Sequence, residues 1–450
     1  MRCCFVFIVI LLASTGCQST RSPTRTQTLA IPRVSPESFR HQPAVETVSF
    51  DSEAAPVGTD IETLVMQGLA QNPRILAAHH RIEAARARID QTIALPDPMV
   101  NTTSFVDPVQ TAAGEQEFGL GISQKLVRAD RRHTRAALES EQVAIAQARL
   151  KQDQLQLAQQ IRSVCVRLIF LRKTQAVIAQ DQLALADIEE AIIRKYEVDQ
   201  DVSQQDVLNV QVERSKVENQ ITDLKKKERV LESTLARLLD VGPQTYFQIE
   251  DELASYSDSY AIDLLLRQAL DARPELQVQL AQIRQATKKI HLARLQRQPD
   301  FTLGVNWIST SNEGVSPVAN GDDAVLVGVG FNLPVNRQRI RAAICEAQSM
   351  QRASEYELAG IHADISEEIV SLVETIEALQ TTIELVSTDI VPKAEQSLNM
   401  SIDEFAAGDS DYVELVENWR SLFKYRLSEL QLRSEFHQTL VDLRKAIGEL

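Results

Sequence analysis

The sequence predicts a mainly α-helical chain with two amphipathic β-hairpins, built as two copies of one plan. Three observations indicate this fold class. The chain has neither glycine nor proline between Gly121 and Gly242, apolar residues there recur at every seventh position, and shorter segments alternate apolar with small or polar residues. With 44% hydrophobic and 24% charged residues in a length of 450, the composition excludes a disordered chain and a disulfide-stabilised miniprotein.

The N-terminus has the pattern of an export signal over residues 1–16. Arg2 precedes an apolar stretch that is too short to span a bilayer, and small residues lead to Cys17. This order predicts a lipoprotein signal and a lipidated Cys17; ordinary signal cleavage with an unmodified cysteine is the alternative. Residues 17–60 are rich in Ser, Thr and Pro, which is typical of an extended linker between a lipid anchor and a folded body.

The segment without glycine and proline predicts two antiparallel helices that pack along their length. One series of apolar residues at seven-residue spacing runs from Val143 to Ile192, and a second series, out of phase with it, runs from Val210 to Leu238. Polar residues between the two series predict a turn, the first tip, near residue 200. A helix over residues 129–198 would be a rod about 105 Å long.

The second half of the chain repeats this plan. Isoleucines recur at every seventh position from Ile369 to Ile390, and a second tip is predicted near residue 408. Pro73 and Pro274 stand at equivalent places, each before a short helical segment. We therefore expect an internal duplication, with a first repeat at residues 61–250 and a second at 251–450.

Each repeat contains a predicted β-hairpin, at residues 99–125 and 301–333. In the second hairpin, residues 301–308 and 325–332 alternate apolar with small or polar residues on either side of a loop rich in Gly, Asn and Asp. Such strands suit a transmembrane β-barrel. A soluble sheet packed on helices is the alternative, but the helices are already committed to long helical seams.

Four strands cannot close a barrel. An open sheet edge in lipid would leave backbone groups unpaired, at a cost of several kcal/mol each. The chain must therefore associate with copies of itself, and three copies would supply twelve strands while two would supply eight.

Several short motifs, in this order and spacing, resemble the TolC-like outer-membrane efflux family over residues 60–450. The motifs are Leu69 to Pro73, Phe118 to Gln124, Ser203 to Leu208, Pro299 to Phe301, Phe331 to Pro334 and Leu443 to Gly448. The resemblance implies a homotrimer with a 12-stranded β-barrel in the outer membrane, continued across the periplasm by an α-barrel of coiled-coil helices. It further implies a passive exit duct that docks through its helical tips onto a periplasmic adaptor (membrane fusion protein) and an inner-membrane pump.

Residues 118–126 and 203–213 most resemble the heavy-metal cation branch of that family, which serves resistance–nodulation–division pumps. The resemblance therefore implies export of small molecules or metal cations from a Gram-negative-type bacterium. Two alternatives stay open. A type I secretion duct for polypeptides shares the architecture, whereas a structural coiled-coil lipoprotein of the envelope would leave the amphipathic hairpins unexplained.

Arginines follow each hairpin at matching places. They are Arg128, Arg131 and Arg132 after the first hairpin, and Arg337, Arg339 and Arg341 after the second. Positive charge at a helix N-terminus is unfavourable against the helix dipole, so these side chains need a partner. Phosphates of the outer-membrane lipids at the barrel's rim are one hypothesis, and a solvated charged face is the other.

The two predicted tips are acidic. Candidates for a periplasmic aperture or for adaptor docking are Asp199, Gln200, Asp201, Ser203 and Asp206 at the first tip, and Gly408, Asp409, Ser410 and Asp411 at the second. Copies of the chain would multiply the carboxylates into rings, which favour cations, and we expect Asp409 and Asp411 to help line the aperture. The alternative is that polar tips only solvate a helix turn.

Other classes of function find no support in the sequence. The chain has 47 Lys and Arg against 62 Asp and Glu, a net charge of −15, and no basic block, so nucleic-acid binding is not expected. The histidines and methionines form no ligand pattern, and no nucleophile or phosphate-loop motif occurs, so we expect no enzyme activity, cofactor or bound metal. Cys165 and Cys345 lie in helices of different halves, and no disulfide is expected.

Overall fold

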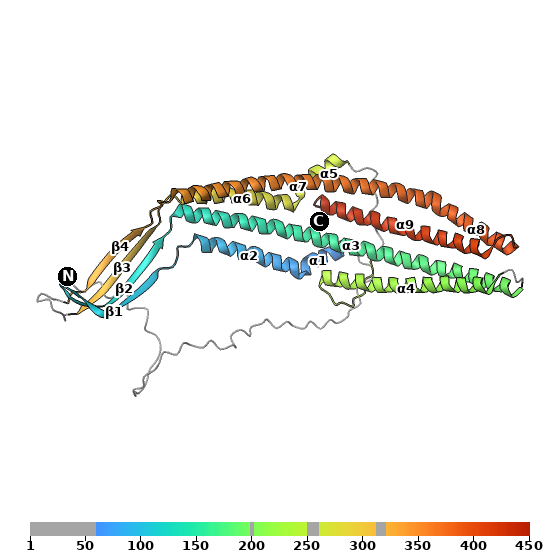
Figure 1. Ribbon diagram of the computed structural model, residues 1–450, viewed down its shortest axis with the longest axis horizontal. Coiled ribbons are helices and arrows are strands. Elements are labelled where there is room, and N and C mark those ends of the chain that lie inside the picture. The colour runs from blue at the N-terminus through green and yellow to red at the C-terminus, as the bar shows by residue number, and fades with distance from the viewer. Residues whose placement is uncertain (1–59, 199–201, 250–260, 312–320) are drawn as a thin grey trace, which may run out of the picture. The chain divides into compact units, whose positions relative to one another are not determined.

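The computed structural model describes residues 60–198, 202–249, 261–311 and 321–450. Within these ranges the chain is mainly helical and contains four β-strands, which confirms the fold class that the sequence predicts (Figure 1). The predicted signal peptide, the linker and Cys17 lie outside the described residues, as do Asp199, Gln200 and Asp201 of the first tip. No helix in the described part is long and apolar enough to cross a membrane.

The four strands form one antiparallel sheet. The strands β1 (Met99–Thr111), β2 (Gly114–Leu126), β3 (Phe301–Ser311) and β4 (Ala324–Phe331) lie in the order β1-β2-β3-β4. The central pairing of β2 with β3 joins the two halves of the chain. Strand β1 continues to Thr111, although a bulge between Ser104 and Val109 shifts its register with β2.

Long helices continue from the sheet in both halves. Helix α3 (Ala129–Val198) follows β2 and has 70 residues, while α4 (Gln204–Leu239) returns beside its second part. Helix α7 (Arg337–Leu385) follows β4, and α8 (Val391–Ala407) and α9 (Tyr412–Ala446) complete the second half. The apolar heptad positions of α3 and α4 are buried at their contact, for example Leu185, Ile192 and Val210 at 0% exposure.

Short helix pairs precede each hairpin. The pair α1 (Ile61–Gln71) and α2 (Pro73–Ile93) recurs as α5 (Ile262–Ala272) and α6 (Pro274–Leu295), each broken before its proline. At the first break the Asn72 side chain accepts a hydrogen bond from the backbone N–H of Arg74 and donates one to the carbonyl of Leu238, both 2.9 Å long. This contact ties the break to the end of α4.

Helix α3 has more neighbours than the expected antiparallel hairpin. Its first part packs between α2 and α6, and its second part packs against α4 and α9 (Figure 1). The buried apolar residues accordingly form separate cores: one where α1, α3 and α4 meet, one at the tips, and one where α5, α7 and α9 meet. The prediction of isolated helix pairs was incomplete because a heptad pattern shows that a face is buried without showing which helix buries it.

One predicted helix is interrupted. The seven-residue spacing from Ile369 to Ile390 predicts a continuous helix, but a π-helical turn at Val386–Ile390 separates α7 from α8. The cause is Pro392, which has no N–H to donate and whose ring would clash with the carbonyl four residues earlier. A π-helical turn is one of the few ways in which a helix absorbs such a break and continues.

Candidate functional site

The sheet has one apolar and one small, polar face. Residues directly opposite one another on neighbouring strands share a face, and Leu120 lies opposite Trp307 while Ile122 lies opposite Val305. The apolar face consists of Val100, Phe118, Leu120, Ile122, Phe301, Leu303, Val305, Trp307, Val325, Val327, Val329 and Phe331. All of these side chains are exposed, from 38% at Trp307 to 76% at Val327. An exposed apolar surface of this extent marks contact with lipid or with another protein.

The opposite face of the sheet carries mostly small and polar residues. It carries Gly119, Gly121, Ser123, Gly304, Asn306, Gly328 and Gly330. At Gly121 an added Cβ would lie 2.0 Å from Oδ1 of Asn306, so a larger residue there would displace the asparagine. Small side chains leave room on this face, as the lumen of a barrel requires.

Both outer strands of the sheet have a free edge. Among the described residues β1 pairs only with β2, and β4 pairs only with β3. Their unpaired N–H and C=O groups need hydrogen-bond partners if the sheet lies in lipid. Strands from other copies of the chain would satisfy them.

Arg131, predicted to lie at the membrane rim, has its partners inside the chain. Its guanidinium donates to Oδ2 of Asp300 at 2.6 Å and to the carbonyls of Leu295 and Gln298 at 2.9 and 3.1 Å. Both charged side chains are only 11% exposed. The Asp300 carboxylate, directly before β3, is thus the charge partner of Arg131 within the chain, and a contact of Arg131 with a lipid phosphate stays a prediction.

The remaining five arginines of that group are arranged differently in the two halves. Arg128 pairs with Asp130 at 2.8 Å and Arg132 donates to the carbonyl of Ile93 at 2.7 Å. The hydrogen bond from Arg128 lowers the pKa of the Asp130 carboxyl. After the second hairpin Arg337, Arg339 and Arg341 are all exposed, and no ion pair of theirs is found among the described residues.

At the second tip the chain turns through Gly408, whose φ of 87° is one that glycine adopts without strain. The backbone N–H of Asp409 donates to the carbonyl of Glu404 at 2.9 Å, which closes the end of α8. Asp411 precedes α9 without a side-chain cap. The carboxylates of Asp409 and Asp411 are exposed, and Ser410 lies between them half-buried.

At the first tip, two of the predicted residues cap a helix. The N–H and Oγ of Ser203 both donate to the Asp206 carboxylate, at 2.9 and 2.7 Å, and the N–H of Asp206 donates back to Oγ of Ser203. This capping box stabilises the start of α4 by satisfying backbone donors that have no partner within the helix. The polar residues there thus have a structural role that the sequence pattern alone did not separate from docking.

The two tips are held together. Near the end of α3, the Lys195 ammonium donates to the carbonyl of Phe405 at 2.8 Å and lies 4.4 Å from the centre of its ring. Val202 of the first tip is buried in a core that also contains Phe405, Tyr412 and Leu415 of the second. The tips therefore form one unit within the chain.

Two buried acidic residues near the tips, Glu213 and Asp181, were not predicted from the sequence. The Glu213 carboxylate accepts from Lys216 and Arg420, each at 2.7 Å. Burial acts to raise the pKa of Glu213, but the hydrogen bonds from Lys216 and Arg420 outweigh it and hold this pKa below its usual value. A signal was present, because Glu213 lies between Val210 and Val217 at a spacing that is normally apolar.

Asp181 of α3 is the second buried carboxylate that was not predicted. It is 3% exposed, and only one of its oxygens has a partner, the Arg426 guanidinium at 3.0 Å; Arg426 also binds Glu395 at 2.7 Å. Burial raises the pKa of Asp181 despite this arginine. Asp181 stands between Ile178 and Leu185, again at a spacing that is normally apolar.

No cluster of metal-ligating side chains occurs in the described part of the chain. His80, one of the adjacent histidines at 79–80, contacts Glu83 at 3.0 Å on the exposed surface of α2. Cys165 is buried and Cys345 exposed, and both thiols are free.

Comparison with known proteins gives a family match in the second half of the chain. Residues 265–449 match the outer membrane efflux protein family. Over 189 residues, 41% of the chain, the sequence is 22% identical to the cobalt-zinc-cadmium resistance protein CzcC of Cupriavidus metallidurans, and this match spans 42% of that protein.

The fold is similar to solved outer-membrane proteins. The outer membrane protein VceC of Vibrio cholerae has a TM-score of 0.71 and 18% identity, with 86% of this chain and 96% of that chain covered. CusC, whose crystal structures were described together with transmembrane channel formation, has a TM-score of 0.71 and 16% identity, with 89% of this chain and 96% of that chain covered. The chain therefore has the fold of the outer-membrane efflux channels. Its residues 265–449 match the outer membrane efflux protein family, which confirms the resemblance of the motifs.

Proposed function

We propose that the chain is the protomer of a passive exit duct of the outer membrane. Three copies form a homotrimer with a 12-stranded β-barrel in the membrane and an α-barrel in the periplasm. The duct releases small molecules or metal cations that an inner-membrane pump delivers through a periplasmic adaptor, and it has no catalytic step of its own.

The four-stranded sheet carries this proposal. It combines an exposed apolar face, a face of small residues and two free edges, and it continues into α3 and α7 within a few residues. A structural coiled coil would need none of these features. A closed barrel made of several copies needs all three.

The proposed cargo and partners rest on the relatives. The name of the relative CzcC associates that protein with resistance to cobalt, zinc and cadmium, which supports metal cations as cargo for this chain. A resistance–nodulation–division pump is proposed as partner because residues 118–126 and 203–213 resemble the heavy-metal cation branch. We place the adaptor at the joined tips, where α3 and α8 end and α4 and α9 begin. Export of polypeptides through a type I system has no observation in its favour.

The membrane anchor has two proposed parts. A lipid on Cys17 would hold the mature N-terminus at the outer membrane. Arg337, Arg339 and Arg341, exposed beside the sheet, would contact phosphates of the inner leaflet. Charge reversal of these three arginines should reduce the amount of trimer in the outer membrane, and an unchanged amount would remove the second part.

Asp409 and Asp411 are proposed to line the periplasmic aperture. Replacing both with Asn should lower the preference for cations and change the single-channel conductance, since a ring of carboxylates attracts cations. Asp364→Asn, which neutralises an exposed carboxylate of α7 far from the tip, serves as the control. Unchanged conductance and selectivity in the double variant would exclude an aperture role for this pair.

The duct itself is tested in planar bilayers. Protein purified from membranes in detergent should insert and give discrete conductance steps. A correctly folded preparation that inserts without conducting, or that never inserts, would contradict the proposal.

A further inference from the structure

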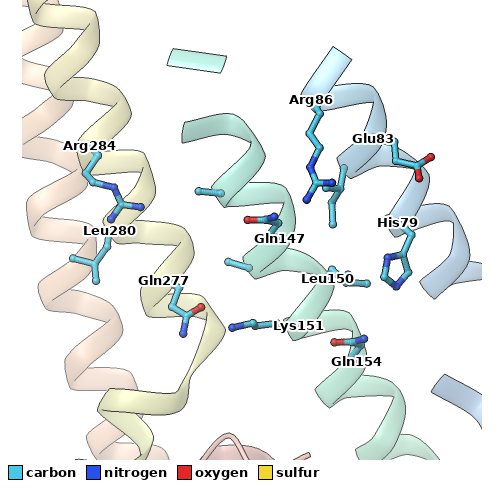
Figure 2. A pocket seen from close by; sticks show the side chains of 13 residues that line it. His79, Glu83, Arg86, Gln147, Leu150, Lys151, Gln154, Gln277, Leu280 and Arg284 are labelled. Atoms are coloured by element: carbon cyan, nitrogen blue, oxygen red, sulfur yellow. The ribbon is translucent and has the colours of Figure 1, made fainter. Parts of the chain in front are cut away.

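A groove runs along α3 between α2 and α6. Its volume is about 640 Å³, and side chains of the three helices line it; in Figure 2 Lys151 extends from α3 toward α6, while Arg86 lies on the α2 side of α3. Its polar lining includes Arg86, Gln147, Lys151, Gln154, Gln277 and Arg284. Leu150 and Leu280 add apolar surface. The groove therefore offers cations and amides above a partly apolar lining.

The groove is cationic in an otherwise acidic chain. Arg86 and Lys151 have no ion-pair partner among the described residues, whereas Arg284 pairs with Glu141 at 2.8 Å. The one carboxylate in the lining, Glu83, faces His80 at 3.0 Å. The two unpaired cations, on facing helices, can pair with carboxylates of a ligand. The three glutamine amides beside them can form hydrogen bonds with amide or hydroxyl groups of the same ligand.

The heptad positions of the groove residues on α3 show which face of this helix carries the groove. Gln154 precedes Ile161 by one heptad, and Lys151 precedes Ala158 by one heptad, so each pair lies on the same face of α3. Ile161 and Ala158 are completely buried, in a core with α1 and Phe247. An added Cβ on Gly68 of α1 would lie 2.4 Å from Cδ1 of Ile161, so α1 covers this face directly.

In the proposed α-barrel, an element that packs on the long helices from inside would block the lumen, so such elements must lie on the outside of the barrel. The face that α1 covers is therefore the outer face, and the groove, on the same face nearer the sheet, opens toward the periplasm and not toward the lumen. Lys151 lies about 33 Å along α3 from Ala129 and about 70 Å from Val198 at the tip. The groove is thus remote from the tips at which the adaptor is proposed to dock.

We propose that this outer groove binds peptidoglycan through the carboxylates of its stem peptides. This inference rests on the proposed function, because only a duct that crosses the periplasm passes through that layer. The free carboxylates would pair with Arg86 and Lys151, and the glutamines would bind peptide amides and sugar hydroxyls. Such contacts would fix the height of the duct in the envelope independently of its pump.

The test uses the full-length, membrane-purified protein and a soluble disaccharide tetrapeptide from peptidoglycan, with affinity measured by calorimetry at physiological salt. The variant Arg86→Gln/Lys151→Gln should bind about tenfold more weakly than the wild type, since each surface ion pair contributes only a modest amount. Arg88→Gln/Arg149→Gln is the matched control: it removes two exposed arginines from the same two helices outside the groove and should bind like the wild type. The wild type should bind a muropeptide with amidated carboxyls about as weakly as the groove variant binds the unmodified one.

The outcomes separate this inference from the duct. Equal binding by the groove variant and the wild type, or no binding by the wild type, overturns the inference. If the same preparation conducts in bilayers, the duct proposal stands and only the groove assignment fails. If it does not conduct, the duct proposal fails first. Unchanged melting temperatures of both double variants would exclude misfolding as the cause of weaker binding.

Discussion

At the scale of single residues, the junction between sheet and helices depends on the ion pair of Arg131 with Asp300. Both side chains are largely buried, and the arginine also donates hydrogen bonds to two backbone carbonyls. Arg131→Ala would leave the Asp300 carboxylate without its charge partner, and we expect a loss of about 3 kcal/mol in stability. The melting temperature of the detergent-solubilised protein measures it.

The control for this prediction is Arg128→Ala. Arg128 and Asp130 are each 40% exposed, so breaking their pair should change the melting temperature little. The double variant Arg131→Ala/Asp300→Ala should lose less than the sum of its single variants, because no charge is left buried. Strict additivity of the two single variants would show that the ion pair is not the cause.

Glu213 predicts a dependence of stability on pH. Its pKa is lower in the folded chain than in the unfolded one, so its contribution is complete above the ordinary pKa of about 4.5 and is lost as the pH falls through the lowered folded value. At pH 7 the wild type should therefore have a higher melting temperature than Glu213→Gln, and the difference should narrow as the pH falls below about 4.5. A gap that widens on acidification would contradict the assignment.

Few of the site residues at this scale follow from the sequence. Ser203 and Asp206 were expected at a tip, and the structure adds that they form a capping box. Lys195 was not expected, because a lysine near a polar turn looks solvated until its partner is known. That partner, the carbonyl of Phe405, is 210 positions away, and no local pattern encodes such a contact.

At the scale of secondary-structure elements, the two faces of β4 should tolerate charge differently. Val327 lies on the apolar face and its neighbour Leu326 on the opposite one. Val327→Lys would put a charge into lipid, at about 2–4 kcal/mol, and should reduce the yield of folded protein in the outer membrane. Leu326→Lys, one residue away, should be inserted normally, and equal yields from the two variants would remove the assignment of the lipid face.

The contact of Lys195 with Phe405 predicts how the tips are coupled. Lys195→Met removes a charged hydrogen bond of about 1.5 kcal/mol, so amide exchange in residues 405–411 should accelerate roughly tenfold. Arg194→Met, which breaks an exposed pair with Glu190 on the same helix, is the control and should leave this exchange unchanged. Exchange that responds equally to both variants would mean that Lys195 does not join the tips.

Elements were predictable where their signal is local. Heptad spacing placed the long helices because a buried stripe on one helix leaves the same period whatever covers it. The π-helical turn at Val386–Ile390 was missed because the isoleucine spacing continues across it. Pro392, six residues after its start, was the available signal.

At the scale of the whole molecule, the sequence predicted two separate hairpins, and the structure joins them through β2 and β3 into one sheet. That pairing connects residues far apart in the chain, and strand register at such separation leaves no trace in a single sequence. The joined sheet strengthens the account, since it reduces four strand edges to two. Each chain then needs one neighbour at β1 and one at β4.

We infer that three copies of this chain close the free edges of the sheet. The most direct measurement is the mass of the protein extracted from the outer membrane, determined by native mass spectrometry in detergent. We expect the mass of three copies, which supply twelve strands and close a barrel. A stable monomer, or a complex of two copies, would contradict it.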